Sequence, residues 1–256
     1  MNVTYDFSGQ VALVTGAGAG MGLATARAFA ESGASVVVSD VDEDAARQLA
    51  DELNAAGYDA FAVACNVADD TQVAELIRQA VEHYGRLDLA YNNAGVQPVP
   101  AEMAEQSLDE YERVMGINLR GVWSCMRHEL AQMREQESGG AIVNCSSVGG
   151  LVGGKALGSY YGSKHGVIGL TRTAAMDYAA RGIRINAVCP GAINTPMVAK
   201  MLEEQKEAMD EFLKLQAIGR LGTADEVAQA VLWLCSDGAS FVTGTSLAVD
   251  GCFTAN

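Results

Sequence analysis

The strongest constraint on the fold is a regular alternation of short apolar segments with longer helical ones. The apolar segments are the expected strands: Val11–Thr15, Ser35–Asp40, Ala60–Ala64, Leu87–Tyr91, Ala141–Ser146, Arg184–Val188 and Ser246–Val249. The expected helices lie between them: Gly20–Glu31, Glu43–Ala55, Thr71–His83, Leu108–Arg134, Ser159–Ala180 and Ala224–Cys235. Strands that alternate with helices form βαβ units. The sequence therefore predicts an α/β fold with a mostly parallel seven-stranded sheet and helices on both faces.

The domain organisation follows from the length and from the absence of a linker. Hydrophobic residues make up 49% of the 256 residues, which is enough for a sizeable core, and no Pro/Gly/Ser-rich tract divides the chain. We expect a single doubly wound domain of the Rossmann type over residues 1–256. The less regular segment 194–217 contains Met197, Met201 and Met209. It is expected to be a mobile helical insertion that forms a lid over a substrate. Met197, Met201 and Leu202 are the candidate lid residues, and ordinary core is the alternative for these three.

The charge balance excludes some partners. A net charge of −15 would repel nucleic acid and anionic membranes. No apolar run approaches the ~20 residues of a membrane span. The six cysteines lack C-x-x-C spacing or the spacing of a disulfide framework. We therefore expect a cytoplasmic protein without nucleic-acid or membrane partners.

A glycine-rich segment, TGAGAGMG at Thr15–Gly22, joins the first expected strand to the first expected helix. Glycines at such a turn let the backbone approach a pyrophosphate, and the helix N-terminus offers free N–H groups and a positive dipole. The strand–turn–helix context is the one that a dinucleotide site requires. The expected contacts are Gly16, Gly18, Ala19, Gly20, Met21 and Gly22. A purely structural tight turn is the alternative.

Asp40, at the end of the second expected strand, bears on the choice of dinucleotide. A carboxylate there can accept hydrogen bonds from ribose hydroxyls and would repel a 2′-phosphate. The neighbouring Val41 is not basic, and Arg27 and Arg47 are expected to face elsewhere. We therefore predict NAD rather than NADP. A helix N-cap is the alternative role for Asp40.

Tyr160 and Lys164 are four residues apart and share one face of an expected helix. A free phenol has a pKa near 10, and a neighbouring ammonium lowers that pKa. The pair therefore predicts an acid/base group. Ser147, just beyond an expected strand, can hydrogen-bond the reacting oxygen; Ser146 is the competing candidate, and a turn role is the alternative.

Together these residues resemble the short-chain dehydrogenase/reductase family over nearly the whole chain, from Gly9 to Gly251. The resemblance rests on motifs in the family's order and spacing: the glycine segment, NNAG at Asn92–Gly95, Asn118, Ser147 with Tyr160 and Lys164, and Pro190-Gly191 followed by Thr195.

The resemblance implies a role for each of these residues. Tyr160 would be the catalytic acid/base. Lys164 would bind the nicotinamide ribose, Ser147 would orient the substrate oxygen, and Asn118 would hold a water in a proton relay. The implied cofactor contacts beyond the glycine segment and Asp40 are Val41, Asn66, Val67, Asn93, Ala94, Gly95, Pro190, Gly191, Ile193 and Thr195. The family also implies a homo-oligomer, usually a tetramer.

Two positions depart from the family pattern. Asn66 stands where the family usually has an Asp that faces the adenine amino group, although an amide carbonyl is still an acceptor. Cys252 replaces a common glycine, and a subunit contact is one reading of this change. The histidines are scattered and no cluster has metal-ligand spacing, so no metal site is predicted.

The segment between Ser147 and Tyr160 is glycine-rich and apolar, with Lys155 as its one charged residue. The expected substrate residues are Gln97, Ser147, Gly149, Tyr160, Met197 and Met201. They predict a modest, mostly apolar pocket for a small or cyclic secondary alcohol or ketone, and the chain is similar to members that oxidise cyclic alcohols and dihydrodiols. The alternatives are a 3-ketoacyl thioester reductase, a non-catalytic NAD-binding regulator, and an epimerase or dehydratase that acts through a transient ketone.

Overall fold

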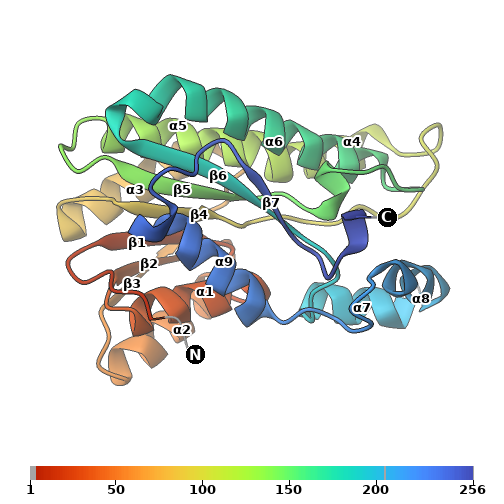
Figure 1. Ribbon diagram of the computed structural model, residues 1–256, viewed down its shortest axis with the longest axis horizontal. Coiled ribbons are helices and arrows are strands. Elements are labelled where there is room, and N and C mark those ends of the chain that lie inside the picture. Colours follow the sequence, from red (N-terminus) through yellow and green to blue (C-terminus); the bar gives the residue numbers. More distant parts are fainter. Residues whose placement is uncertain (1–3, 205, 256) are drawn as a thin grey trace.

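The computed structural model describes residues 4–204 and 206–255, so the expected domain 1–256 and the expected lid 194–217 each extend to residues outside the described ones. Seven parallel strands form one sheet in the order β3-β2-β1-β4-β5-β6-β7 (Figure 1). The strands are β1 (Val11–Thr15), β2 (Ser35–Asp40), β3 (Ala60–Ala64), β4 (Leu89–Asn92), β5 (Gly140–Cys145), β6 (Ile183–Pro190) and β7 (Ser246–Val249). The strand order reverses between β1 and β4, and open α/β sheets bind ligands at the carboxyl ends of the strands at such a point.

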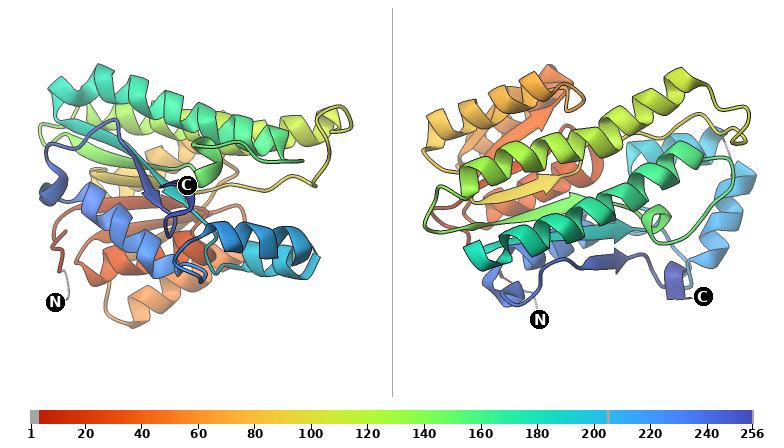
Figure 2. Two further views of the ribbon diagram at one scale, coloured as in Figure 1. Left: turned by 45° about the vertical axis from the view of Figure 1, so that its right-hand side comes forward. Right: turned by 90° about the horizontal axis from the view of Figure 1, so that it is seen from above.

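Helices cover both faces of the sheet (Figures 1 and 2). They are α1 (Gly20–Glu31), α2 (Glu43–Ala55), α3 (Asp70–Tyr84), α4 (Leu108–Met115), α5 (Val122–Met133), α6 (Gly158–Tyr178), α7 (Pro196–Glu204), α8 (Lys206–Leu215) and α9 (Ala224–Cys235). One buried cluster packs α1, α2 and α9 against the sheet, and a second packs α3, α5 and α6 against the other face. The predicted α/β class and doubly wound arrangement are confirmed. None of the described helices is long and apolar enough to span a membrane.

Several predicted boundaries were wrong. The strand expected from Leu87 begins at Leu89, because the backbone of Leu87 is instead hydrogen-bonded to the side chain of Gln136. The helix expected over Leu108–Arg134 contains a π-helical turn at Gly116–Gly121, which separates α4 from α5. This turn contains Asn118, and π-helical turns inside helices are frequent at functional sites.

Cys252 has a left-handed backbone conformation, with φ of 72°. A β-carbon makes this conformation costly, and glycine adopts it without that cost. The conformation explains why a glycine is common at this position. Of the six cysteines, Cys252 alone is exposed; the other five are buried.

Glu129 on α5 has a fully buried carboxyl group. Asn92 Nδ2 donates a hydrogen bond of 3.0 Å to Glu129 Oε2 and another of 3.0 Å to Asn144 Oδ1. Glu129 Oε1 has no partner among the described residues. Burial raises the pKa of Glu129 to about 7, because the interior disfavours the charged form.

This raised pKa predicts a pH-dependent stability. The protonated carboxyl group contributes stability that is fully present below the unfolded-state pKa of 4.5 and is lost as the pH rises through the folded-state pKa of about 7. The loss is on the order of 3 kcal/mol. We expect Glu129→Gln to remove this loss, so that the variant gains stability relative to wild type at higher pH. Urea unfolding at about pH 5 and about pH 8 measures the difference.

Glu137→Gln is the matched control, because Glu137 is an exposed carboxylate that follows the same helix. It should unfold with the wild-type pH dependence. An unchanged pH dependence in Glu129→Gln would contradict the assignment to this buried group.

Candidate active site

Two adjoining cavities lie along the carboxyl ends of the strands. One follows the β1–α1 turn to the ends of β2 and β3, and the other lies between the end of β5, α6 and α7. The two cavities form one continuous cleft, because they share six lining residues: Met21, Asn93, Gly95, Val96, Thr195 and Met197. The first cavity has a volume of about 440 Å³, within the roughly 300–1,000 Å³ of ligand pockets, and the second is smaller, at about 160 Å³.

The first cavity is built around the glycine segment, which leaves no room for side chains. A β-carbon on Gly22 would lie 2.1 Å from Gly16 O and 2.6 Å from Asn93 Nδ2. Gly16 and Gly20 have left-handed backbones, with φ of 63° and 57°. The turn therefore exposes backbone at the start of α1, and this shape fits a pyrophosphate.

Asn93 holds this turn against the end of β4. Its Nδ2 donates to Thr15 O at 3.1 Å and to Gly16 O at 3.0 Å, and its backbone N–H donates to Thr15 Oγ1 at 3.1 Å. Both amide hydrogens of Asn93 are thus used to fix the turn. The cofactor contribution expected of Asn93 is therefore largely indirect, although the residue also lines the cleft.

Asp40 lies at the end of β2 and lines the first cavity. Its Oδ2 accepts a hydrogen bond of 2.8 Å from Gly18 N, and its Oδ1 accepts one of 3.0 Å from Asp42 N. The N-cap of α2 is Asp42 and not Asp40. Arg27 and Arg47 pair with the α2 carboxylates Glu52 and Glu43, and neither residue lines the cleft.

The expected adenine end of the cleft is lined by Val41, Asn66 and Val67. Asn66 Oδ1 accepts a hydrogen bond of 3.1 Å from Ala68 N, so this carbonyl also closes a local turn. The other expected cofactor contacts line the two cavities, except Gly18 and Gly22, which support the turn from behind.

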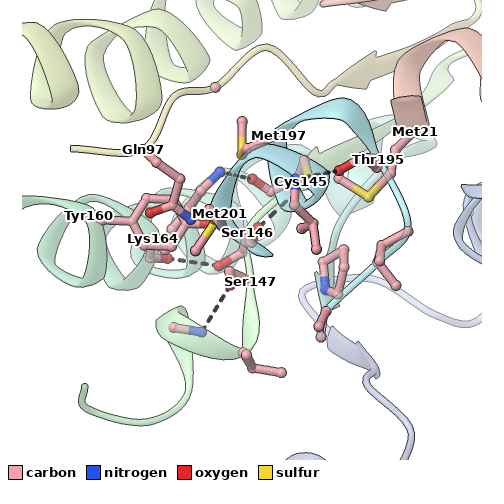
Figure 3. A pocket seen from close by; sticks show the side chains of 18 of the residues that line it. Met21, Gln97, Cys145, Ser146, Ser147, Tyr160, Lys164, Thr195, Met197 and Met201 are labelled. Carbon is pink, nitrogen blue, oxygen red and sulfur yellow. Dashed lines mark hydrogen bonds between the residues drawn. The ribbon is translucent and has the colours of Figure 1, made fainter. Parts of the chain in front are cut away.

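The second cavity contains the expected catalytic residues. Lys164 is buried on α6, and its Nζ donates a hydrogen bond of 2.8 Å to Cys145 O at the end of β5. Ser146 Oγ donates to Lys164 O at 2.9 Å, which leaves Ser147 as the serine available to a substrate. Ser147 Oγ accepts from Gly149 N at 3.0 Å (Figure 3).

The pair of Tyr160 and Lys164 differs from the expectation in the pKa of Tyr160. Burial raises the pKa of Tyr160 to about 12, and a hydrogen bond with Ser147 partly offsets this effect. Lys164 Nζ lies 5.7 Å from the centre of the Tyr160 ring and donates to Cys145 O. The expected lowering of the Tyr160 pKa by Lys164 is therefore not found: burial dominates the shift of Tyr160, and burial also lowers the pKa of Lys164.

Asn118 is fully buried and its side chain does not line the cleft. Its Oδ1 accepts from Val96 N at 2.8 Å, and its Nδ2 donates to Val96 O at 2.9 Å. Gly95 lies between Asn118 and Lys164, since a β-carbon on Gly95 would be 3.4 Å from Asn118 Oδ1 and 3.5 Å from Lys164 Nζ. The side chain of Asn118 thus fixes the loop that follows β4.

The expected substrate residues all line the second cavity: Gln97, Ser147, Gly149, Tyr160, Met197 and Met201. Further members of the wall are Val148 and Leu157, from the glycine-rich segment expected at the pocket, and Val198 and Met209, from the expected lid. Sequence reasoning missed Tyr161. Tyr161 follows Tyr160 on α6, and its ring lies against Gly154. Among the described residues, no group of three or more His, Cys, Asp or Glu side chains could hold a metal ion.

A sequence profile for the family described as enoyl-(acyl carrier protein) reductase matches residues 16–254. Together with the motifs and the cleft, this match shows that the chain belongs to the short-chain dehydrogenase/reductase family of oxidoreductases.

Individual relatives narrow the comparison. Cyclohexanol dehydrogenase of Acinetobacter sp. strain SE19 is 44% identical over 252 residues, which are 98% of each chain. The 3-oxoacyl-(acyl-carrier-protein) reductase of Thermotoga maritima is 38% identical over 243 residues, which cover 95% of this chain and 97% of that protein. The crystal structure of levodione reductase superposes with a TM-score of 0.91 at 38% identity, over 97% of this chain and 99% of that one.

The packing of Gly22 yields a direct test of the first cavity. Alanine at this position would clash with Gly16 O and Asn93, so we expect the turn to shift. Gly22→Ala should lose about 1–3 kcal/mol of stability and at least about tenfold in dinucleotide affinity. Thermal unfolding and titration calorimetry measure the two effects. Gly153→Ala is the control, because no heavy atom lies within 4 Å of a β-carbon there. Wild-type affinity in Gly22→Ala would exclude this turn as the binding site.

Proposed function

We propose that the protein is an NAD-dependent alcohol dehydrogenase and ketone reductase, which transfers a hydride between NAD(H) and a small, apolar or cyclic secondary alcohol or ketone. The observation that carries this proposal is the position of Ser147, Tyr160 and Lys164 in one cavity that opens directly into the glycine-lined cleft. A hydride transfer needs a dinucleotide and a proton-transfer group side by side, and this cleft provides room for both.

The residues of the first cavity fit a dinucleotide. The glycine turn would hold the pyrophosphate, Asp40 the adenosine ribose, and Asn66 and Val67 the adenine. Lys164 and the segment from Pro190 to Thr195 would hold the nicotinamide end. When bound, the nicotinamide accepts or returns the hydride.

The protein's own part in the reaction is to orient the substrate and to move a proton. Because burial favours the neutral phenol, Tyr160 is protonated at neutral pH and can donate to a carbonyl oxygen during reduction. Oxidation needs the opposite transfer, so it is expected to be faster at higher pH. Ser147 would hold the reacting oxygen beside Tyr160. Lys164, which is buried nearby, would favour the phenolate when a proton must leave. The relay role implied for Asn118 would not use its side-chain amide, which is bonded to Val96.

The choice of NAD over NADP rests on Asp40. Its carboxylate is fixed by two backbone N–H groups, and the two nearest arginines are paired with other carboxylates. A 2′-phosphate beside Asp40 would meet a negative charge with no compensating cation.

The substrate class rests on the wall of the second cavity, which is mostly aliphatic, methionine and aromatic. The relative named cyclohexanol dehydrogenase supports a cyclic alcohol. The similarity to 3-oxoacyl-(acyl-carrier-protein) reductase keeps a hydroxyacyl thioester as the second candidate. The net charge of −15 argues against docking an acidic carrier protein.

We also propose a homo-oligomer in the cytoplasm. The outer face of α5 and α6 exposes Trp123 and Met176, which are 44% and 85% exposed, beside shallow hollows lined by Leu119 and Leu170. Exposed apolar surface of this kind is typical of subunit contacts.

The enzymatic proposal is tested by the absorbance of reduced cofactor. Purified protein is offered NAD with cyclohexanol, other cyclic and acyclic secondary alcohols, and a 3-hydroxyacyl thioester. We expect turnover with cyclic alcohols, and a loss of about 10²–10⁴-fold in kcat for Tyr160→Phe, because the proton-transfer group is removed. Dinucleotide affinity should be unchanged.

Tyr178→Phe is the matched control, since Tyr178 ends the same helix and lies outside the cleft. It should retain wild-type turnover. Near-normal turnover in Tyr160→Phe would contradict the assignment of Tyr160 as the acid/base group. Binding of NAD without turnover of any alcohol would favour a non-catalytic regulator, or an epimerase or dehydratase that acts through a transient ketone.

The cofactor preference gives a separate prediction. Asp40→Ser removes a charged acceptor, and hydrogen bonds to charged groups contribute about 1.5–3 kcal/mol. The variant should therefore lose about 10–100-fold in kcat/KM for NAD, with a smaller effect for NADP. Asp42→Ser, two residues away at the N-cap of α2, should keep the preference for NAD. A wild-type enzyme that prefers NADP would overturn the proposed role of Asp40.

A further inference from the structure

The side-chain amide of Gln97 is a polar group of the substrate cavity that the proposed chemistry does not use. Gln97 lies in the loop after β4 and lines the cavity, and its side chain extends toward Tyr160 and Lys164 (Figure 3). Its Oε1 is buried and has no hydrogen-bond partner among the described residues. Buried polar atoms in proteins almost always have a partner, so an unpartnered amide oxygen on a residue that lines a cavity indicates a ligand group that donates to it.

The other polar side chains around the cavity already have partners. Asn93 is bonded to the glycine turn, and Ser146 Oγ donates to Lys164 O. Thr195 Oγ1 accepts from Val198 N at 3.3 Å. Outside the expected catalytic group of Ser147, Tyr160 and Lys164, two polar groups of the described wall thus remain uncommitted. They are the amide of Gln97 and the hydroxyl of the half-buried Tyr161.

The loop that carries Gln97 is fixed on both sides. Arg113 Nη2 donates a hydrogen bond of 2.7 Å to Gln97 O, and Arg113 itself pairs with Glu110 on α4. Glu110 Oε1 accepts from Val99 N at 2.8 Å, and Asn118 binds both backbone polar groups of Val96. The amide is therefore presented to the cavity by a rigid backbone, as a binding group requires.

The neighbouring wall cannot satisfy this amide. The side chains of Val148, Leu157, Met197 and Met201 offer no strong hydrogen-bonding atom. A ring that carries a single hydroxyl, placed with that hydroxyl at Ser147 and Tyr160, would cover Gln97 with C–H groups and leave its amide unpaired. A second hydroxyl would pair with it, because a hydroxyl both donates and accepts and so matches either orientation of the amide.

We propose that Gln97 determines specificity by hydrogen-bonding a second hydroxyl group of the substrate, so that the preferred substrates are cyclic diols. This inference rests on the proposed alcohol dehydrogenase function and narrows its substrate class. A site built to bond a hydroxyl discriminates against the analogue that lacks it, because the amide of the protein is then buried without a partner.

The test compares cyclohexanol with 1,2-, 1,3- and 1,4-cyclohexanediol, each with NAD, in wild type and Gln97→Met. Methionine keeps the length of the side chain and removes the amide. We expect the best diol to exceed cyclohexanol by at least about tenfold in wild-type kcat/KM. Gln97→Met should lose about 10–100-fold in kcat/KM with that diol and a much smaller factor with cyclohexanol. The isomer most affected identifies the ring position that faces Gln97.

Met201→Leu is the matched control, since it alters the apolar wall without touching a hydrogen bond; it should change the rates with cyclohexanol and the diols by the same factor. Equal losses with cyclohexanol and diols in Gln97→Met would assign Gln97 a merely structural role. Wild-type turnover of cyclohexanol without any advantage for a diol would overturn the inference and leave the dehydrogenase proposal intact. Absence of turnover with every alcohol would overturn both.

Discussion

The cleft depends on the contact between the ends of β1 and β4, which Asn93 maintains. Its amide donates to Thr15 O and Gly16 O, and these two bonds hold the glycine turn against the next strand. The turn can approach so closely because Gly16 and Gly22 lack β-carbons. The strand order reverses at this point, so α1 and the loop after β4 diverge to opposite sides of the sheet. A cleft opens there, and both cavities are extensions of it.

The catalytic half of the site is held by a second set of contacts, between β5 and α6. Lys164 donates to Cys145 O, and Ser146 donates to Lys164 O, so side chains tie the end of the strand to the helix in both directions. These bonds keep a buried ammonium next to a buried phenol. The burial raises the pKa of Tyr160 and lowers that of Lys164, because the interior disfavours the charged form of each group. Neighbouring groups with pKa values shifted in opposite directions are typical of acid/base sites.

The sequence predicted what depends on local pattern and missed what depends on tertiary contacts. The alternation of strands and helices, the glycine turn and the pairing of Tyr160 with Lys164 follow from periodicity, spacing and family motifs. The π-helical turn around Asn118 has no periodic signal, because one extra residue per turn changes only the register. Ser107 and Glu110 have the spacing of a capping box, and Ser107 does cap α4, because its Oγ accepts from Glu110 N at 3.2 Å. The Glu110 carboxylate instead binds Val99 N and Arg113, and these tertiary contacts have no signal in the local sequence.

Backbone hydrogen bonds that hold the binding residues explain how one scaffold could serve different alcohols. On our proposals, Asp40 selects the cofactor and Gln97 the substrate, and each residue is fixed through backbone hydrogen bonds that do not depend on the ligand. Asp40 accepts from Gly18 N and Asp42 N, while Gln97 O accepts from Arg113. Arg113 and Glu110 bind main-chain atoms of the loop and not the side chain of Gln97. A different side chain at position 97 would therefore be held by the same loop backbone. Substrate preference can therefore change at this position without disturbing Ser147, Tyr160 or Lys164.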